Sequence, residues 1–205
     1  EYSDFAVLYR TNAQSRLLEE KCILYSIPYR LVGGVNFYQR KEIKDILCYL
    51  KTIANGQDDL AVQRIINVPK RGIGATSVGK VTIFASANGM SFYDALLRVR
   101  GIPTLGKAAD KIGVFTEQIE DFKARLPKMS IKELIEEVLE NTGYKKEIEA
   151  EGEIESETRL QNIEELINKA VSYSENEENP TLDGFLEEVA LVADVDNMDE
   201  SENRI

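Results

Sequence analysis

The pattern of hydrophobic and polar positions predicts helices along most of the chain. From residue 42 to residue 54, apolar side chains recur every three or four positions, which leaves one side of a helix apolar. The same periodicity predicts helices over residues 59–66, 76–87, 91–99, 107–126, 130–142, 159–174 and 181–193. Side chains that cap helix N-termini mark several of these starts, namely Asp58, Ser91, Ser130 and Thr181. Residues 147–157 alternate acidic with small side chains and predict a loop or a frayed helix.

The first 34 residues follow a different pattern, which predicts a strand, a helix and a second strand. The apolar run Phe5–Tyr9 and the run at residues 29–32 are typical of short, buried parallel strands. Between them a helix is predicted over residues 13–26, capped by Thr11 or Asn12. Its predicted inward side chains are Leu17, Leu18, Ile23 and Leu24. Two strands do not make a sheet, so we expect partner strands outside this sequence and a chain that is a piece of a longer protein.

Composition excludes several classes of protein. Hydrophobic residues make up 43% of the 205 residues and charged residues 30%, as in ordinary soluble domains. No apolar run approaches the roughly 20 residues that span a bilayer, so we expect no membrane partner. The sequence contains no histidine, which excludes His-based triads and His metal sites. Cys22 and Cys48 make neither a disulfide framework nor a zinc site, so we expect no metal, and they fit a reducing cytoplasm.

The net charge of -11 is distributed unevenly. Residues 1–128 contain 19 Lys and Arg against 13 Asp and Glu, whereas residues 129–205 contain 6 against 23. The first part is therefore suited to a polyanionic partner although the whole chain is acidic. The acidic second part is typical of the solvated faces of amphipathic helices.

Four short segments have the residue types of a phosphate or nucleic-acid contact. Tyr9-Arg10 follows the first predicted strand, at the edge where α/β sheets bind ligands. An arginine there binds phosphate through a planar fork of donors, and an aromatic residue stacks on a base. The alternative is a surface arginine beside a core tyrosine.

Phe37-Tyr38, before Arg40-Lys41, either stacks on a single strand or forms a hydrophobic staple at a helix start.

Another candidate segment is a glycine turn between two predicted helices. The glycines of Gly72-Ile73-Gly74 let backbone amides approach a phosphate, and the next helix adds its positive N-terminus near Thr76. Such a turn grips a DNA backbone without reading bases, and the alternative is a plain tight turn. The positive charges come from Lys70, Arg71 and Lys80. A similar turn with Thr142, Gly143 and Lys145 is a second candidate DNA contact, or a simple helix C-cap.

The sequence also lacks the residues that hydrolyse ATP. It contains no Gly-x-x-x-x-Gly-Lys-Ser/Thr segment and no Asp-Glu pair at the end of an apolar strand. We therefore expect no ATPase activity from this chain alone.

Five segments together resemble the UvrD/PcrA/Rep helicases of superfamily 1A. They occur in the family's order, at residues 6–16 (motif IV), 28–34, 40–45, 67–74 and 159–166. Residues 144–191 are most similar to the PcrA branch of Gram-positive bacteria. The resemblance implies a mainly α fold, in which an all-helical inserted domain, 2B, is attached to an incomplete α/β RecA-like piece of domain 2A. The implied domains are residues 1–68 for 2A and 69–193 for 2B, with 194–205 as an acidic, disordered end.

The resemblance also implies a function. The parent would be a 3′–5′ ATP-dependent DNA helicase of repair or replication that uses ATP and Mg²⁺. Arg10 would touch the γ-phosphate, Tyr9 would stack on adenine, and the turn at Gly72 would grip duplex DNA. The partners would be DNA, domains 1A and 1B, and the rest of 2A, with no cofactor bound to this piece alone. The alternatives are an acidic helical protein-interaction module, or the non-motor part of a helicase–nuclease subunit.

Overall fold

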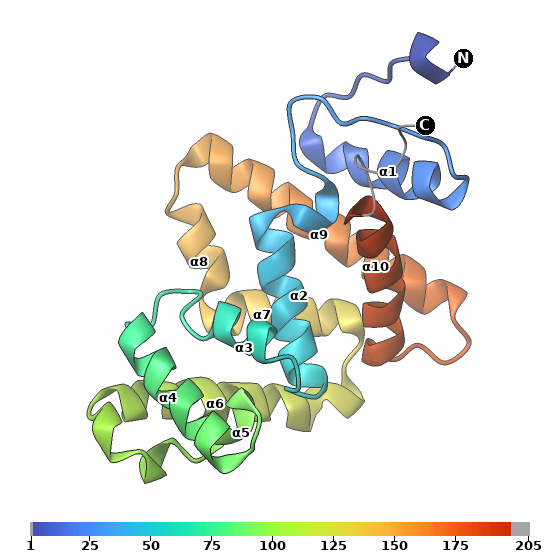
Figure 1. Ribbon diagram of the computed structural model, residues 1–205. Coiled ribbons are helices and arrows are strands. Elements are labelled where there is room, and N and C mark those ends of the chain that lie inside the picture. The colour runs from blue at the N-terminus through green and yellow to red at the C-terminus, as the bar shows by residue number, and fades with distance from the viewer. Residues whose placement is uncertain (1, 198–205) are drawn as a thin grey trace, which may run out of the picture. The chain divides into compact units, whose positions relative to one another are not determined.

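The computed structural model describes residues 2–197, except for the side chains of residues 3, 103 and 194–197, and over that range it contains helices and no strand (Figure 1). The predicted mainly α class is therefore confirmed. The α-helices are α1 (Ser15–Leu24), α2 (Lys41–Ala54), α3 (Asp59–Ile65), α4 (Ala75–Asn88), α5 (Phe92–Leu97), α6 (Ala108–Arg125), α7 (Ile131–Thr142), α8 (Tyr144–Glu149), α9 (Glu153–Asn176) and α10 (Leu182–Asn197). Short 3-10 helices are η1 (Tyr2–Asp4), η2 (Asn12–Gln14), η3 (Phe37–Gln39), η4 (Val99–Gly101), η5 (Pro103–Leu105) and η6 (Leu126–Lys128).

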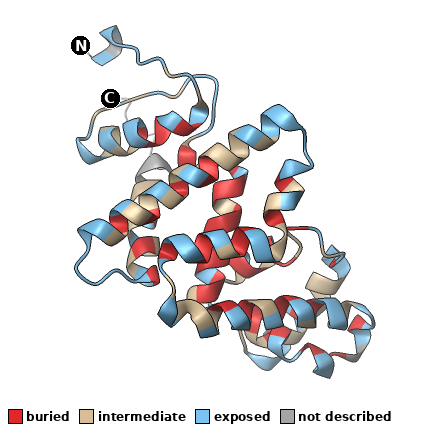
Figure 2. Ribbon diagram, turned by 180° about the vertical axis from the view of Figure 1, so that it is seen from behind, coloured by how far each residue is buried: buried red, intermediate tan, exposed pale blue. Residues whose placement is uncertain are grey.

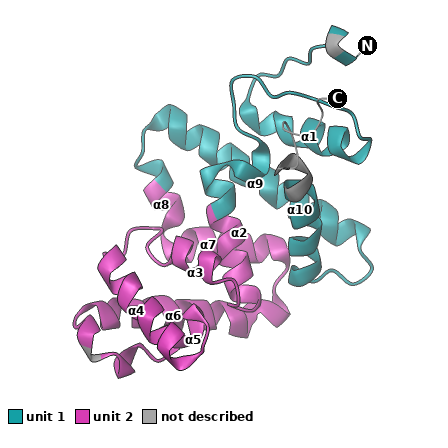
Figure 3. Ribbon diagram, viewed as in Figure 1, with its two compact units in different colours: residues 1–44, 148–205 teal, residues 45–147 magenta. Residues whose placement is uncertain are grey.

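The chain divides into two compact units (Figure 3). Unit 1 consists of residues 1–44 and 148–205, and unit 2 consists of residues 45–147. In unit 1, α1 packs against α10, and η2 packs against α9. In unit 2, α5 contacts both α4 and α6. The boundary predicted between residues 68 and 69 follows from the family resemblance and stays a prediction.

Helix periodicity and helix capping account for most of these elements. The apolar face of α2 is buried as predicted, and α2 is largely red in Figure 2. The predicted inward residues of α6, Ile112, Phe115, Ile119 and Phe122, are all buried, as is Thr116, which was not predicted. Asp58 accepts a hydrogen bond from the Ala61 amide at 3.0 Å, and Ser130 accepts one from the Glu133 amide at 3.2 Å. These caps pair amides that the first helical turn leaves without partners.

The two predicted strands are not present. Residues 5–9 and 29–32 have no regular secondary structure, and Leu8 is 94% exposed. A strand is stabilised by hydrogen bonds to a neighbouring strand, and the described residues supply no such neighbour. The prediction that these apolar runs form strands within this chain is therefore wrong.

The predicted inward face of the first helix is also wrong. Leu17, Leu18 and Leu24 are exposed and Ile23 is half-buried, whereas Ser15, Arg16 and Glu19 are buried. The reason is that α1 turns its polar face toward partners in unit 1, among them Arg40 and Glu165. Its leucines therefore form an exposed apolar surface.

The acidic segment before α9 is more helical than predicted. Helix α8 ends at Glu149 and α9 begins at Glu153, so the break is only three residues long. Glutamate has a high helix propensity, and its carboxylate is stabilising in the first turn. At the other end, α10 reaches Asn197, so residues 194–197 of the expected disordered end are helical. Residues 198–205 lie outside the described residues.

Candidate nucleotide and nucleic-acid contacts

The Tyr9-Arg10 segment forms a loop whose backbone is held by one side chain. The amides of Arg10 and Thr11 both donate to Oε1 of Gln14, at 3.0 and 3.3 Å. The Arg10 side chain is exposed, and among the side chains that the structure describes its guanidinium has no hydrogen-bond or ion-pair partner. Tyr9 is half-buried beside it. The loop therefore presents the guanidinium of Arg10, whose N–H groups have no partner among the described side chains, next to the aromatic ring of Tyr9.

The glycine turn of unit 2 is organised around Asn67. Its Oδ1 accepts hydrogen bonds from the amides of Arg71 (2.9 Å) and Ile73 (3.1 Å). The Ile73 side chain is only 2% exposed, so it lies under the turn. Gly72 has a φ of +70°, a conformation that side chains with a Cβ rarely adopt. The asparagine and the isoleucine thus fix the turn from its inner side.

Four amides around this turn remain available. Within the described part of the chain, the N–H groups of Gly72, Gly74, Ala75 and Thr76 have no hydrogen-bond partner. The last two belong to the first turn of α4, a helix of 14 residues. Unpaired amides at a helix start carry a partial positive charge and are suited to an anion.

Arg71 does not face solvent as a free cation. Its Nη2 donates to the hydroxyl of Tyr49 at 2.6 Å, and its Nη1 lies 3.1 Å from the carbonyl oxygen of Ile65 and 3.2 Å from that of Pro69. Its guanidinium carbon also lies 5.2 Å from the centroid of the Phe115 ring. Arg71 therefore supports the turn from inside, a role that its sequence position did not reveal.

Two lysines, Lys70 and Lys111, lie at the turn, and a third, Lys80, lies further along α4. Lys70 is exposed, and its ammonium group has no partner among the described residues. The ammonium group of Lys80 donates to the carbonyl oxygen of Thr104. Lys111, on α6, donates to the carbonyl oxygen of Gly72 at 3.3 Å. Sequence reasoning missed Lys111 because it lies 39 residues from Gly72, and no local pattern links the two.

The second glycine turn lies against the first one inside unit 2. Gly143 has a φ of +79° and ends α7, as a C-cap does. The Thr142 hydroxyl donates to the carbonyl oxygen of Val138 at 2.6 Å, and Lys145 forms an ion pair with Glu140 at 2.6 Å. The two turns are joined because a carboxylate oxygen of Glu147 accepts from the Lys70 amide at 2.7 Å. The structure therefore brings both predicted DNA contacts together, although the charge of Lys145 is partly neutralised.

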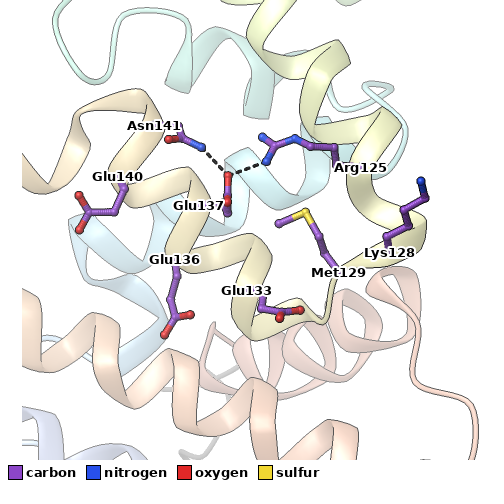
Figure 4. Close-up of a pocket in the computed structure, with 8 residues that line it drawn as sticks. All are labelled: Arg125, Lys128, Met129, Glu133, Glu136, Glu137, Glu140 and Asn141. Atoms are coloured by element: carbon purple, nitrogen blue, oxygen red, sulfur yellow. Dashed lines mark hydrogen bonds and ion pairs between the residues drawn. The ribbon is translucent and has the colours of Figure 1, made fainter.

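A separate groove of about 470 Å³ lies beside α6, η6 and α7 (Figure 4). In the groove, Glu137 accepts hydrogen bonds from Arg125, at 2.7 Å, and from Asn141. The remaining lining residues are Lys128, Met129, Glu133, Glu136 and Glu140. With four carboxylates against two cations, this groove is unsuited to a polyanion.

Two features are absent from the described residues. No group of three or more His, Cys, Asp or Glu side chains is placed to hold a metal ion. No helix is long and apolar enough to cross a membrane.

These observations agree with the comparison of the chain with known families. Residues 1–205 match the UvrD-like helicase C-terminal domain, so the chain belongs to that family, as the five segments predicted. The chain is 45% identical to the ATP-dependent DNA helicase PcrA of Bacillus subtilis over 200 residues, which are 98% of this chain and 27% of that protein. It is 46% identical, with 97% and 27% covered, to the PcrA proteins of Staphylococcus epidermidis and Staphylococcus aureus. The chain thus spans about a quarter of the length of these relatives.

Proposed function

We propose that this chain is the part of a 3′–5′ ATP-dependent DNA helicase that supplies the motif IV nucleotide contact and a helical domain that grips duplex DNA. The family and the printed names of the relatives support a helicase. One observation carries the DNA contact: four unpaired amides, from Gly72 to Thr76, lie beside Lys70 and Lys111. Together these groups form a positively charged contact for a backbone phosphate.

The Tyr9-Arg10 loop is the proposed nucleotide contact. ATP supplies the phosphoryl group whose transfer to water drives the motor. The exposed guanidinium of Arg10 would stabilise negative charge on that group, and the Tyr9 ring would stack on the base. The sequence contains no Walker A segment, so the phosphate cradle and the ligands of Mg²⁺ would come from the other helicase domains.

The exposed apolar side chains of unit 1 support a missing partner domain. Phe5, Leu8, Leu24 and Val32 are each at least 65% exposed, and Leu17 is 54% exposed. Soluble proteins rarely leave such a set uncovered. We assign these side chains to contacts with the remaining strands of domain 2A in the full-length protein.

An unwinding assay of the full-length protein tests this function. The substrates are two partial duplexes that differ only in whether the single-stranded tail is 3′ or 5′. With ATP and Mg²⁺, we expect strand separation of the 3′-tailed duplex and little of the 5′-tailed one. Equal unwinding of both would contradict the polarity, and no ATP-dependent unwinding of either would contradict the function.

A further inference from the structure

Unit 1 contains a network of buried polar side chains that packing alone does not explain. Its members come from α1, the start of α2 with the residue before it, and α9. They are Ser15, Arg16, Glu19, Arg40, Glu42 and Asn162, and each is at most 7% exposed. Burying such groups has a high free-energy cost unless they are mutually hydrogen-bonded.

Arg40 lies at the centre of this network. Its Nη1 donates to Oδ1 of Asn162 at 2.7 Å, and its Nη2 donates to the hydroxyl of Ser15 at 2.7 Å. Its Nε donates to the carbonyl oxygen of Val35 at 3.3 Å, and a carboxylate oxygen of Glu19 lies 3.8 Å from Nη2. Only a planar fork reaches such separate acceptors from one side chain.

One arm of the network ends at the Tyr9-Arg10 loop. The Ser15 hydroxyl, which accepts from Arg40, lies 2.8 Å from the carbonyl oxygen of Asn12, two residues after Arg10. Burial lowers the pKa of Arg40, and the carboxylates of Glu19 and Glu42 act in the opposite direction.

The other arm ends on two long helices. Nδ2 of Asn162, on α9, donates to Oε1 of Glu42 at 2.6 Å. Glu42 lies in the first turn of α2. Through Asn162, therefore, Arg40 is bonded to α9 and indirectly to the start of α2.

We propose that Arg40 is a positioning residue that holds the Tyr9-Arg10 loop in a fixed place relative to α9 and the start of α2. The inference rests on the proposed nucleotide contact of Arg10. Arg40 itself is buried, so it acts on the nucleotide only through the placement of the loop. Arg40→Lys keeps the charge but removes the fork, and Ser15→Ala removes the hydroxyl that joins Arg40 to the carbonyl oxygen of Asn12 and that also bonds to Glu19.

Amide hydrogen exchange measured by mass spectrometry on this chain is the first test. Both variants should raise exchange about tenfold or more at residues 10–15, as expected when one hydrogen bond to a charged group is removed, while peptides of α6 and α7 stay unchanged. Lys169→Ala is the matched control, because it removes a cation of α9 that pairs with Glu188 and Glu20 outside the arm to the loop. Unchanged exchange at residues 10–15, or an equal rise over all of unit 1, would overturn the proposal.

Steady-state ATPase kinetics of the full-length helicase are the second test. Arg40→Lys should lower kcat about tenfold, an effect of misplacing Arg10, with Lys169→Ala unchanged. A normal kcat in Arg40→Lys would overturn the positioning role. Failure of the proposed function is recognised separately, because Arg10→Ala would then leave ATP hydrolysis intact. The exchange measurement tests the role of Arg40 independently of that result.

Discussion

The hydroxyl oxygen of Tyr49, on α2, lies 2.6 Å from Nη2 of Arg71. The same hydroxyl donates to the carbonyl oxygen of Val68 at 2.6 Å. Burial raises the pKa of Tyr49, and Arg71 opposes that effect. One buried phenol thus holds both Arg71 and Val68 beside the Gly72 turn, so the shape of the proposed DNA contact depends on a residue outside the turn.

Tyr49→Phe should destabilise unit 2. The substitution leaves the buried donor of Arg71 and the carbonyl group of Val68 without this partner, at a cost of about 1–3 kcal/mol. Denaturant unfolding measures the change, and Tyr25→Phe is the control because Tyr25 is exposed at the end of α1. Equal stability of the two variants would contradict the structural role of this hydroxyl.

The two cysteines should differ in reactivity. Burial raises the pKa of the Cys48 thiol to about 11, and it raises the pKa of the more open Cys22 as well. Since the thiolate is the nucleophile, alkylation of Cys48 at about pH 8 should be slow and should accelerate up to about pH 11. Peptide mass spectrometry after timed iodoacetamide treatment should show Cys22 modified first.

The same shift predicts a decrease of stability in alkali. Burial raises the pKa of Cys48 in the folded state. The contribution of this thiol to the free energy of unfolding is therefore complete below its ordinary pKa of 9.0, and it disappears as the pH rises toward about 11. Cys48→Ala should remove this part of the pH dependence. If Cys48 reacted as fast as Cys22 at about pH 8, its buried environment would be contradicted.

Arg10→Ala in the full-length protein should lower the kcat of DNA-stimulated ATP hydrolysis about 10³–10⁵-fold, the range known for arginine fingers. Affinity for single-stranded DNA without ATP should stay within about twofold, because Arg10 contacts no DNA in this account. Arg30→Ala is a suitable control, since Arg30 is an exposed arginine of the same unit. A normal kcat in Arg10→Ala would exclude the nucleotide role.

Local signals in the sequence predicted the helices well. The apolar spacing of α2 and α6 and the caps Asp58 and Ser130 involve residues within a few positions of each other, so they are visible without the fold. The strand prediction at residues 5–9 failed because strand pairing depends on partners that the described chain does not supply. The prediction of the buried face of α1 was wrong for the same reason, since its leucines have no apolar layer to cover them within the described residues.

The candidate site was only partly predictable. Gly72 and Lys70 are identifiable from composition and spacing, because glycine turns and lysines have a direct physical meaning there. The inward role of Arg71 depends on Tyr49, 22 residues earlier, and the position of Lys111 depends on how α6 packs. Such long-range contacts follow from tertiary structure, which local patterns do not encode.

Lys111→Ala and Lys70→Ala in the full-length protein should each weaken binding to a duplex junction. For each phosphate that a variant no longer neutralises, the slope of log K against log salt should flatten by about 0.9, with no change in base preference. Lys128→Ala is the control, because Lys128 lies on the acidic groove instead. An unaltered slope in the double variant would show that neither lysine binds the DNA backbone.

The most direct test of the account is the junction affinity of Gly72→Val in the full-length helicase. Valine at a φ of +70° is strained, and its Cβ would lie 2.5 Å from Nζ of Lys111, so the amides would no longer meet a phosphate. Gly79→Ala, with open space around its Cβ in α4, is the matched control. We predict at least about tenfold weaker junction binding for Gly72→Val alone, equivalent to about 1.4 kcal/mol, with ATPase driven by single-stranded DNA preserved. Junction binding as tight as that of Gly79→Ala would contradict the proposal that this turn grips DNA.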